Sequence, residues 1–186
     1  ALATVALGWF AIQLRMDAGF EKQMPTNNEY IKTFKEYRKN LMDANRLTVV
    51  VRARTGTIWN RAALSRLYDV TQAVTYLPFV SRGSVTSLWT PNVFVNEVTE
   101  DGFRADPVIP GTVTPNGLNN ETIASIARST NVGGFIGTLV SRDQHSAMIT
   151  ADLNEFDQHG NKLNYVAFNH VLEKQIRQKF EDKNFE

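Results

Sequence analysis

The chain opens with an apolar run that ends at a sharp polar boundary. Residues 1–14, ALATVALGWFAIQL, contain no charge, and Arg15 and Asp17 come next. A helix needs about 20 apolar residues to cross a bilayer, so this run alone is too short. A signal peptide is a poor fit, because no basic residue precedes the run. We interpret residues 1–16 as the C-terminal part of a transmembrane helix or its extension, with a buried or amphipathic helix of a soluble protein as the alternative.

The composition is that of an ordinary folded protein. Charged residues make up 21% of the chain and apolar residues 42%, so disorder is not expected. A net charge of +1 with both signs interspersed argues against nucleic acid as a partner. The chain has no cysteine, which excludes disulfides, thiolate catalysis and cysteine-based zinc sites. We expect a connecting segment with one helix over 17–45 and an α+β domain over 46–186.

The hydrophobic pattern from residue 46 predicts a β-α-β unit. Residues 47–53 are β-branched and almost continuously apolar, which is typical of a central strand. A helix capped by Asn60 follows and ends at Pro78. Residues 80–90 alternate well enough to be a second strand. Such a crossover places its two strands parallel in one sheet.

Residues from about 91 to 134 change in character, and we interpret them as an insertion in the domain. Four of the six prolines lie there, and residues 93–98 fit a short strand. Asn119 or Asn120 caps a short helix. We expect irregular backbone over much of the insertion, which is too long for a plain connection and is therefore interpreted as functional.

The remaining pattern predicts an antiparallel hairpin and a long helix. Residues 137–141 and 147–153 form the two strands of the hairpin, and the helix covers about 164–182. The order of elements suits a ferredoxin-like, or split β-α-β, fold whose final strand is missing. That fold would leave an open sheet edge, through which the chain could form a homo-oligomer.

Five segments of the sequence resemble one family of membrane transporters. They are DAGFEKQMP at 17–25, VTSLWTP at 85–91, EVTEDG at 97–102, GTLVSRD at 137–143 and GNKLNY at 160–165. Their order and distances are similar to those of RND-superfamily exporters, in particular the MmpL-like and hydrophobe/amphiphile branch. The resemblance covers most of the chain, but no one segment is specific by itself.

The resemblance implies a porter domain on the periplasmic side of a bacterial inner membrane. Such a domain is not an enzyme and receives a hydrophobic or amphiphilic molecule, such as a lipid or a drug. Its partners are the substrate, the rest of the transporter and the membrane. In this family proton flow through intramembrane acidic residues supplies the energy, and these residues lie outside this chain. The alternative is a membrane-anchored periplasmic module that binds a protein partner and has no transport role.

No residue pattern indicates catalysis, a cofactor or a metal. His145, His159 and His170 are scattered and lack metal-ligand spacing. Residues 152–160 are rich in oxygen ligands but do not match the calcium-binding loop of an EF-hand. The glycines at 133–137 do not form a phosphate-binding loop, because no Lys-Ser/Thr follows them.

Aromatic residues outside the helix stripes are the candidates for an apolar binding site. Such side chains, with a few polar groups, line most small-molecule pockets. The alternative for each of them is packing in the core. The candidates are Trp59, Phe94, Phe103, Trp89 and Phe135.

Overall fold

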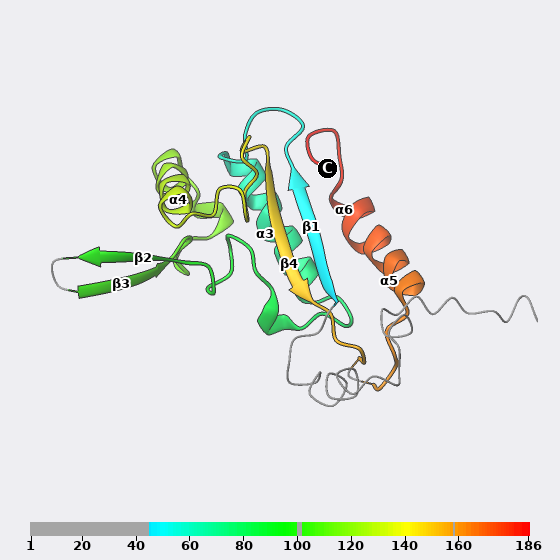
Figure 1. Ribbon diagram of the computed structural model, residues 1–186. Coiled ribbons are helices and arrows are strands. Elements are labelled where there is room, and N and C mark those ends of the chain that lie inside the picture. Colours follow the sequence, from blue (N-terminus) through cyan, green and yellow to red (C-terminus); the bar gives the residue numbers. More distant parts are fainter. Residues whose placement is uncertain (1–44, 100–101, 158) are drawn as a thin grey trace, which may run out of the picture. The chain divides into compact units, whose positions relative to one another are not determined.

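The computed structural model describes residues 45–99, 102–157 and 159–186 (Figure 1). These residues form an α+β domain with two small antiparallel sheets and three main helical segments, which confirms the expected class. None of the described helices is long and apolar enough to cross a membrane. The apolar run at 1–16 and the segment at 17–44 lie outside the described residues.

The larger sheet pairs two strands that are far apart in the sequence. Strand β1 (Arg46–Arg52) runs antiparallel to β4 (Ser146–Asp152), and Val49 lies opposite Ile149. Alternate residues of both strands are buried, as expected for a sheet with one covered face. The fully buried members of that face are Leu47, Val51, Ala147, Ile149 and Ala151.

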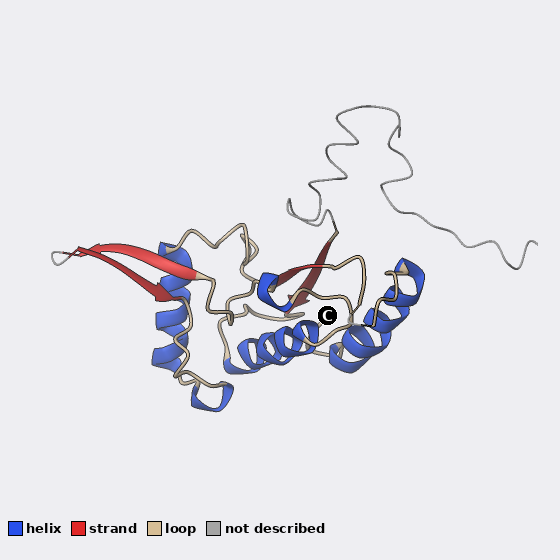
Figure 2. Ribbon diagram, turned by 90° about the horizontal axis from the view of Figure 1, so that it is seen from below, coloured by secondary structure: helices blue, strands red, loops and turns tan. Residues whose placement is uncertain are grey.

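Helix α3 (Arg61–Thr75) packs on this face of the sheet. The Asn60 side chain accepts a hydrogen bond from the Ala63 N–H at 2.8 Å, which confirms the predicted N-cap. Figure 2 shows α3 and the C-terminal helix in one layer on the same side of the sheet. The buried stripe of α3 consists of Ala63, Leu64, Leu67, Val70, Thr71 and Val74.

The predicted strand at 80–90 is not formed. This stretch contains the short 3-10 helix η2 (Arg82–Ser84) and forms no strand ladder with β4. Its contacts there are isolated bridges, from Thr86 to β4 and from Val80 to Leu153 just after it, and a few single hydrogen bonds. Ser84 explains part of the difference, because its hydroxyl donates to the Ser81 carbonyl at 2.7 Å and accepts from the Asp152 N–H at 2.8 Å. Side-chain hydrogen bonds of this kind compete with a regular strand ladder.

The insertion contains a β-hairpin, which projects from the rest of the described residues in Figure 1. The expected short strand is present as β2 (Phe94–Thr99), and it pairs with β3 (Gly102–Pro107). The expectation of irregular backbone was wrong for β3. Its residues 102–106 are all exposed, so burial imposes no alternating pattern on them from which a strand could be predicted.

Helix α4 (Asn120–Val132) follows the 3-10 helix η3 (Pro115–Gly117). Asn119 is its N-cap, since the Asn119 side chain accepts from the Thr122 N–H at 2.8 Å. The short helix predicted here is confirmed, and of the two possible caps the structure selects Asn119.

The prediction of a hairpin between residues 137–141 and 147–153 was wrong, because its first strand is not formed. Residues 137–141 form tight turns, and β4 takes β1 as its strand partner instead. Gly134 and Gly137 adopt positive φ angles of 71° and 91°, which turn the backbone before a strand can extend. What is present of the predicted pairing is an isolated bridge between Val140 and Ala147.

The long C-terminal helix is confirmed, with a change of geometry in its middle. It consists of α5 (Tyr165–Leu172), a π-helical turn η4 (Glu173–Arg177) and α6 (Gln178–Phe180). Asn164 caps it by accepting from the N–H groups of Val166 and Ala167 at 3.0 and 3.1 Å. Helix geometry therefore ends two residues before the predicted boundary at 182.

A buried polar contact joins α3 to the turn at 85–91. The Thr71 hydroxyl donates to the Leu67 carbonyl at 2.7 Å and lies 3.0 Å from the Ser87 hydroxyl. A hydroxyl has one hydrogen, so Ser87 donates to Thr71 and accepts from the Trp89 N–H at 3.1 Å. Both side chains are almost fully buried, and each hydroxyl is a hydrogen-bond partner of the other.

We predict that Ser87→Ala destabilises the domain by about 1–3 kcal/mol, because the buried Thr71 oxygen loses its donor and the Trp89 N–H loses its acceptor. Urea unfolding of the variant measures this loss. Ser125→Ala, on an exposed position of α4, is the matched control and should be close to neutral. Equal midpoints for the two variants would contradict the role given to Ser87.

Candidate functional site

The five candidate aromatic residues do not converge on one site. Three of them are partly buried and pack against the hydrophobic core. Trp59 donates to the Gln144 side chain at 2.6 Å, and Trp89 donates to the Leu64 carbonyl at 2.9 Å. The ring of Phe135 lies against Gly133, where a Cβ would come within 2.5 Å of it. These contacts give each of the three residues a structural role.

The other two candidates lie on the β2–β3 hairpin and are open to solvent. Phe94 is 47% exposed and Phe103 is 91% exposed. In an antiparallel pair, the side chains of two opposite residues lie on the same face of the sheet. Along one strand, the side chains of every second residue also lie on the same face. The register therefore places Phe94, Asn96, Phe103, Ala105 and Pro107 on one face of the hairpin, which we term the hairpin strip.

Two hollows lie elsewhere on the described residues, and none of the five candidates lines either of them. The first is a groove of about 330 Å³ beside β1. The second, of about 400 Å³, lies between the segment after α3 and the loop before α5, and it includes Phe156, Asp157 and His159. Sequence patterns gave no signal for either hollow, because each is assembled from distant segments.

The second hollow is bordered by a loop that satisfies its own polar groups. Asp157 accepts hydrogen bonds from the backbone of His159 and from the backbone and side chain of Asn161, each at 2.8 Å. The side-chain bond from Asn161 is the main reason that the pKa of Asp157 lies below its usual value. Within the described ranges no group of three or more His, Asp or Glu residues is placed to hold a metal ion.

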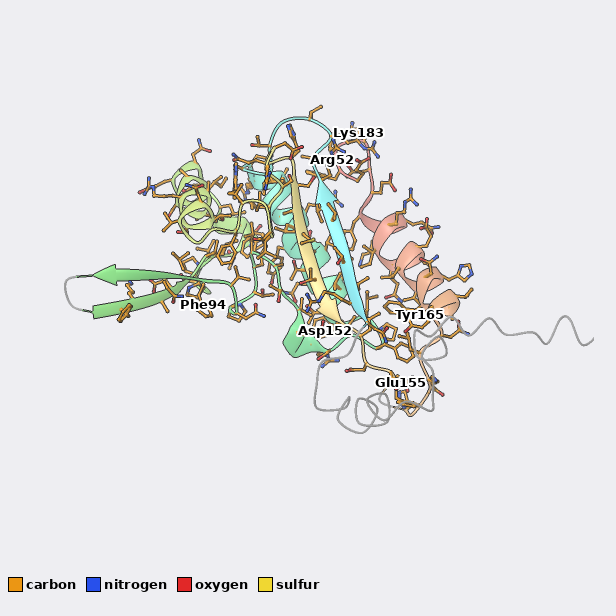
Figure 3. The ribbon with its side chains drawn as sticks, in the orientation of Figure 1. Arg52, Phe94, Asp152, Glu155, Tyr165 and Lys183 are labelled. Carbon is orange, nitrogen blue, oxygen red and sulfur yellow. The ribbon has the colours of Figure 1, made fainter. Side chains whose placement is uncertain are left out.

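The first hollow, which we term the β1 groove, is the more apolar of the two. Its lining comes from β1, α3, the C-terminal helix and the last residues of the chain. The apolar lining residues are Val49, Val50, Val51, Val70, Ile176, Phe180 and Phe185. Figure 3 shows Arg52 and Lys183 close together at one end of β1, with Phe94 well away from them at the base of the hairpin.

The charged groups at the rim of the β1 groove are paired within the chain. Arg66 contacts Asp182 at 2.6 Å, and its guanidinium also lies over the rings of Phe180 and Phe185. Arg177 contacts Glu181 at 2.9 Å. The groove therefore presents apolar walls and a charge-balanced rim, which favours an uncharged occupant over an ionic one.

A tight turn at Asp182 brings the end of the chain onto the edge of β1. The Asp182 carboxylate accepts from the N–H groups of Asn184 and Phe185 at 2.7 and 3.0 Å. These bonds, with the charge of Arg66, hold the pKa of Asp182 below its usual value of 3.8. Arg52 and Glu186 then exchange two backbone hydrogen bonds, at 2.7 and 3.0 Å.

Comparison with protein-family models, with curated proteins and with solved structures found no match to this chain. The resemblance to RND exporters therefore rests on the five quoted segments. Three of them lie fully within the described residues: the turn packed on α3, the turn before β4 and the stretch leading into α5. The segment at 97–102 is described only at residues 97–99 and 102, in strands β2 and β3. The fifth, at 17–25, lies outside the described residues.

We predict that Asp182→Asn frees the end of the chain from β1 at neutral pH, because the amide cannot pair with Arg66 and accepts hydrogen bonds more weakly. Since the folded pKa of Asp182 is lowered, its stabilisation is present above about pH 4 and is lost as the pH falls through the folded value. Hydrogen exchange of the Arg52 amide measures both effects.

The parent chain should therefore lose protection of the Arg52 amide in acid, whereas Asp182→Asn should already lack it at pH 7. Asp69→Asn, on the exposed side of α3, is the control and should keep the protection. An Arg52 amide that exchanges at the same rate in all three proteins would show that Asp182 does not hold the turn.

Proposed function

We propose that this chain is the substrate-receiving, periplasmic domain of a proton-driven RND-type exporter in a bacterial inner membrane. Its cargo is a hydrophobic or amphiphilic molecule, and its role is not enzymatic. The observation that carries the proposal is the order of four segments that lie side by side: the two strands of the larger sheet and one segment along each outer edge. That order is residues 184–186, then β1, then β4, then residues 80–86.

This order supports a ferredoxin-like arrangement. Neighbouring segments are antiparallel at each step. Helix α3 connects β1 to residues 80–86, and the C-terminal helix connects β4 to residues 184–186. In this proposal the two outer segments take the places of the edge strands, so that two β-α-β halves interleave as in the split β-α-β motif. The porter subdomains of RND exporters are built on that motif, so the order agrees with the resemblance of the five segments.

Fold alone does not define function, so the proposal also needs a surface that meets the cargo. The hairpin strip offers two exposed aromatic rings, and aromatic rings contribute much of the contact area in apolar recognition. In this proposal the domain moves as a rigid body during transport, with proton coupling in membrane segments elsewhere. The rest of the transporter is its constant partner.

A second candidate is a membrane-anchored module that binds a protein. The open edge of β1 favours it, because an exposed strand edge is a common docking site for a partner strand. The two candidates differ in which surface carries the function: the hairpin strip for transport and the edge of β1 for assembly.

We predict that a hydrophobic environment-sensitive dye such as Nile red binds the domain weakly through the hairpin strip. Phe94→Ala and Phe103→Ala should each weaken binding about three- to tenfold, as expected for the loss of about 1 kcal/mol of aromatic contact. Fluorescence titration measures this change. Phe103→Ala should leave the unfolding midpoint unchanged, since its ring is 91% exposed.

Phe156→Ala is the matched control for the dye experiment. Its ring is also exposed, at 53%, but it belongs to the second hollow rather than to the hairpin. Dye binding that survives both hairpin variants and is lost in Phe156→Ala would move the binding site to the second hollow.

A further inference from the structure

One edge of β1 is paired at its end, and no described residue pairs with the rest of that edge. Residues 52 and 54 use their backbone groups to bind residues 186 and 184. The N–H and C=O groups of successive residues point to opposite edges of a strand. Those of Val50, Thr48 and Arg46 therefore point to the same edge as those of residues 52 and 54. Within the described part of the chain no backbone partner meets them there.

The β1 groove lies alongside this open stretch and has the apolar lining that a strand requires. Ala53 bridges to Phe185, whose ring is buried on the helix side of the sheet. Continuing in this register, a strand would place every second side chain opposite Val51 and then Val49. Both valines line the groove together with Ile176 and Phe180.

Other occupants suit the β1 groove less well. An anionic lipid or metabolite would need free positive charge, but Arg66 and Arg177 are each paired with carboxylates. A second copy of the chain, related by a two-fold axis through the sheet, would bring its own C-terminal helix to the same side of the joined sheet. The two helices would then compete for the space above one edge.

We infer that the β1 groove is the docking site of one further β-strand, which pairs antiparallel with β1 in direct continuation of residues 184–186. Its side chains facing the groove are apolar and β-branched, and those on the other face are polar. The turn at Asp182 already fixes the direction of the backbone, which reduces the entropy lost when the strand docks. This docking site does not depend on the proposed transport role.

The test is to append to Glu186 a tail long enough to reach Arg46, with valine or isoleucine at the positions facing the groove and threonine or lysine at the others. The expected result is protection of the Val50 and Thr48 amides from hydrogen exchange. The melting temperature should also rise, by about 5 °C or more.

The matched control is a tail of the same composition with the two sets of positions exchanged, since a shift of one residue moves every side chain to the other face. It should give neither protection nor a higher melting temperature. Equal behaviour of the two tails would overturn the inference. It would also be overturned if the chain without a tail formed a dimer in which the Val50 and Thr48 amides were already protected.

Discussion

Burial of one face of α3 against the β1–β4 sheet is the interaction on which the rest of the described domain depends. Leu64, Leu67 and Val74 are almost completely removed from solvent, and each such side chain contributes about 1.5–3 kcal/mol. The turn at 85–91 contacts this helix through Ser87, and the C-terminal helix contacts it where the Phe180 ring lies under Arg66. Every element that borders the β1 groove is therefore positioned by α3.

Turns with their own hydrogen bonds then define where the sheet stops. Ser84 and Thr86 hold residues 80–86 on the outer edge of β4 by a few single hydrogen bonds to Asp152 and Thr150 rather than by a full ladder. Asp182 does the same at the opposite edge, where only the last residues reach β1. In the described part of the chain the sheet therefore has one edge closed by turns and one edge left partly open, and the open edge lies beside the more apolar of the two hollows.

The two candidate surfaces follow from opposite physical causes. The hairpin strip lies on a pair of strands, β2 and β3, that form their backbone hydrogen bonds with each other. The hairpin can therefore extend into solvent without a third strand beside it. The β1 groove is exposed because, among residues 45–99, 102–157 and 159–186, β1 has a strand partner on only one side along most of its length. The first surface suits a ligand that binds side chains, and the second suits a ligand that also offers backbone hydrogen bonds.

The sequence by itself determined the elements whose signals are local: the cap at Asn60, the stripe of α3 and the apolar runs of β1 and β4. Only the tertiary structure decided that β4 pairs with β1, that residues 80–90 and 137–141 remain turns, and that Trp59 and Trp89 pack inward while Phe103 is exposed. The reason is physical. A cap or a stripe depends on neighbours within a few residues, whereas strand partners and burial depend on segments about a hundred residues apart, such as Arg46 and Asp152.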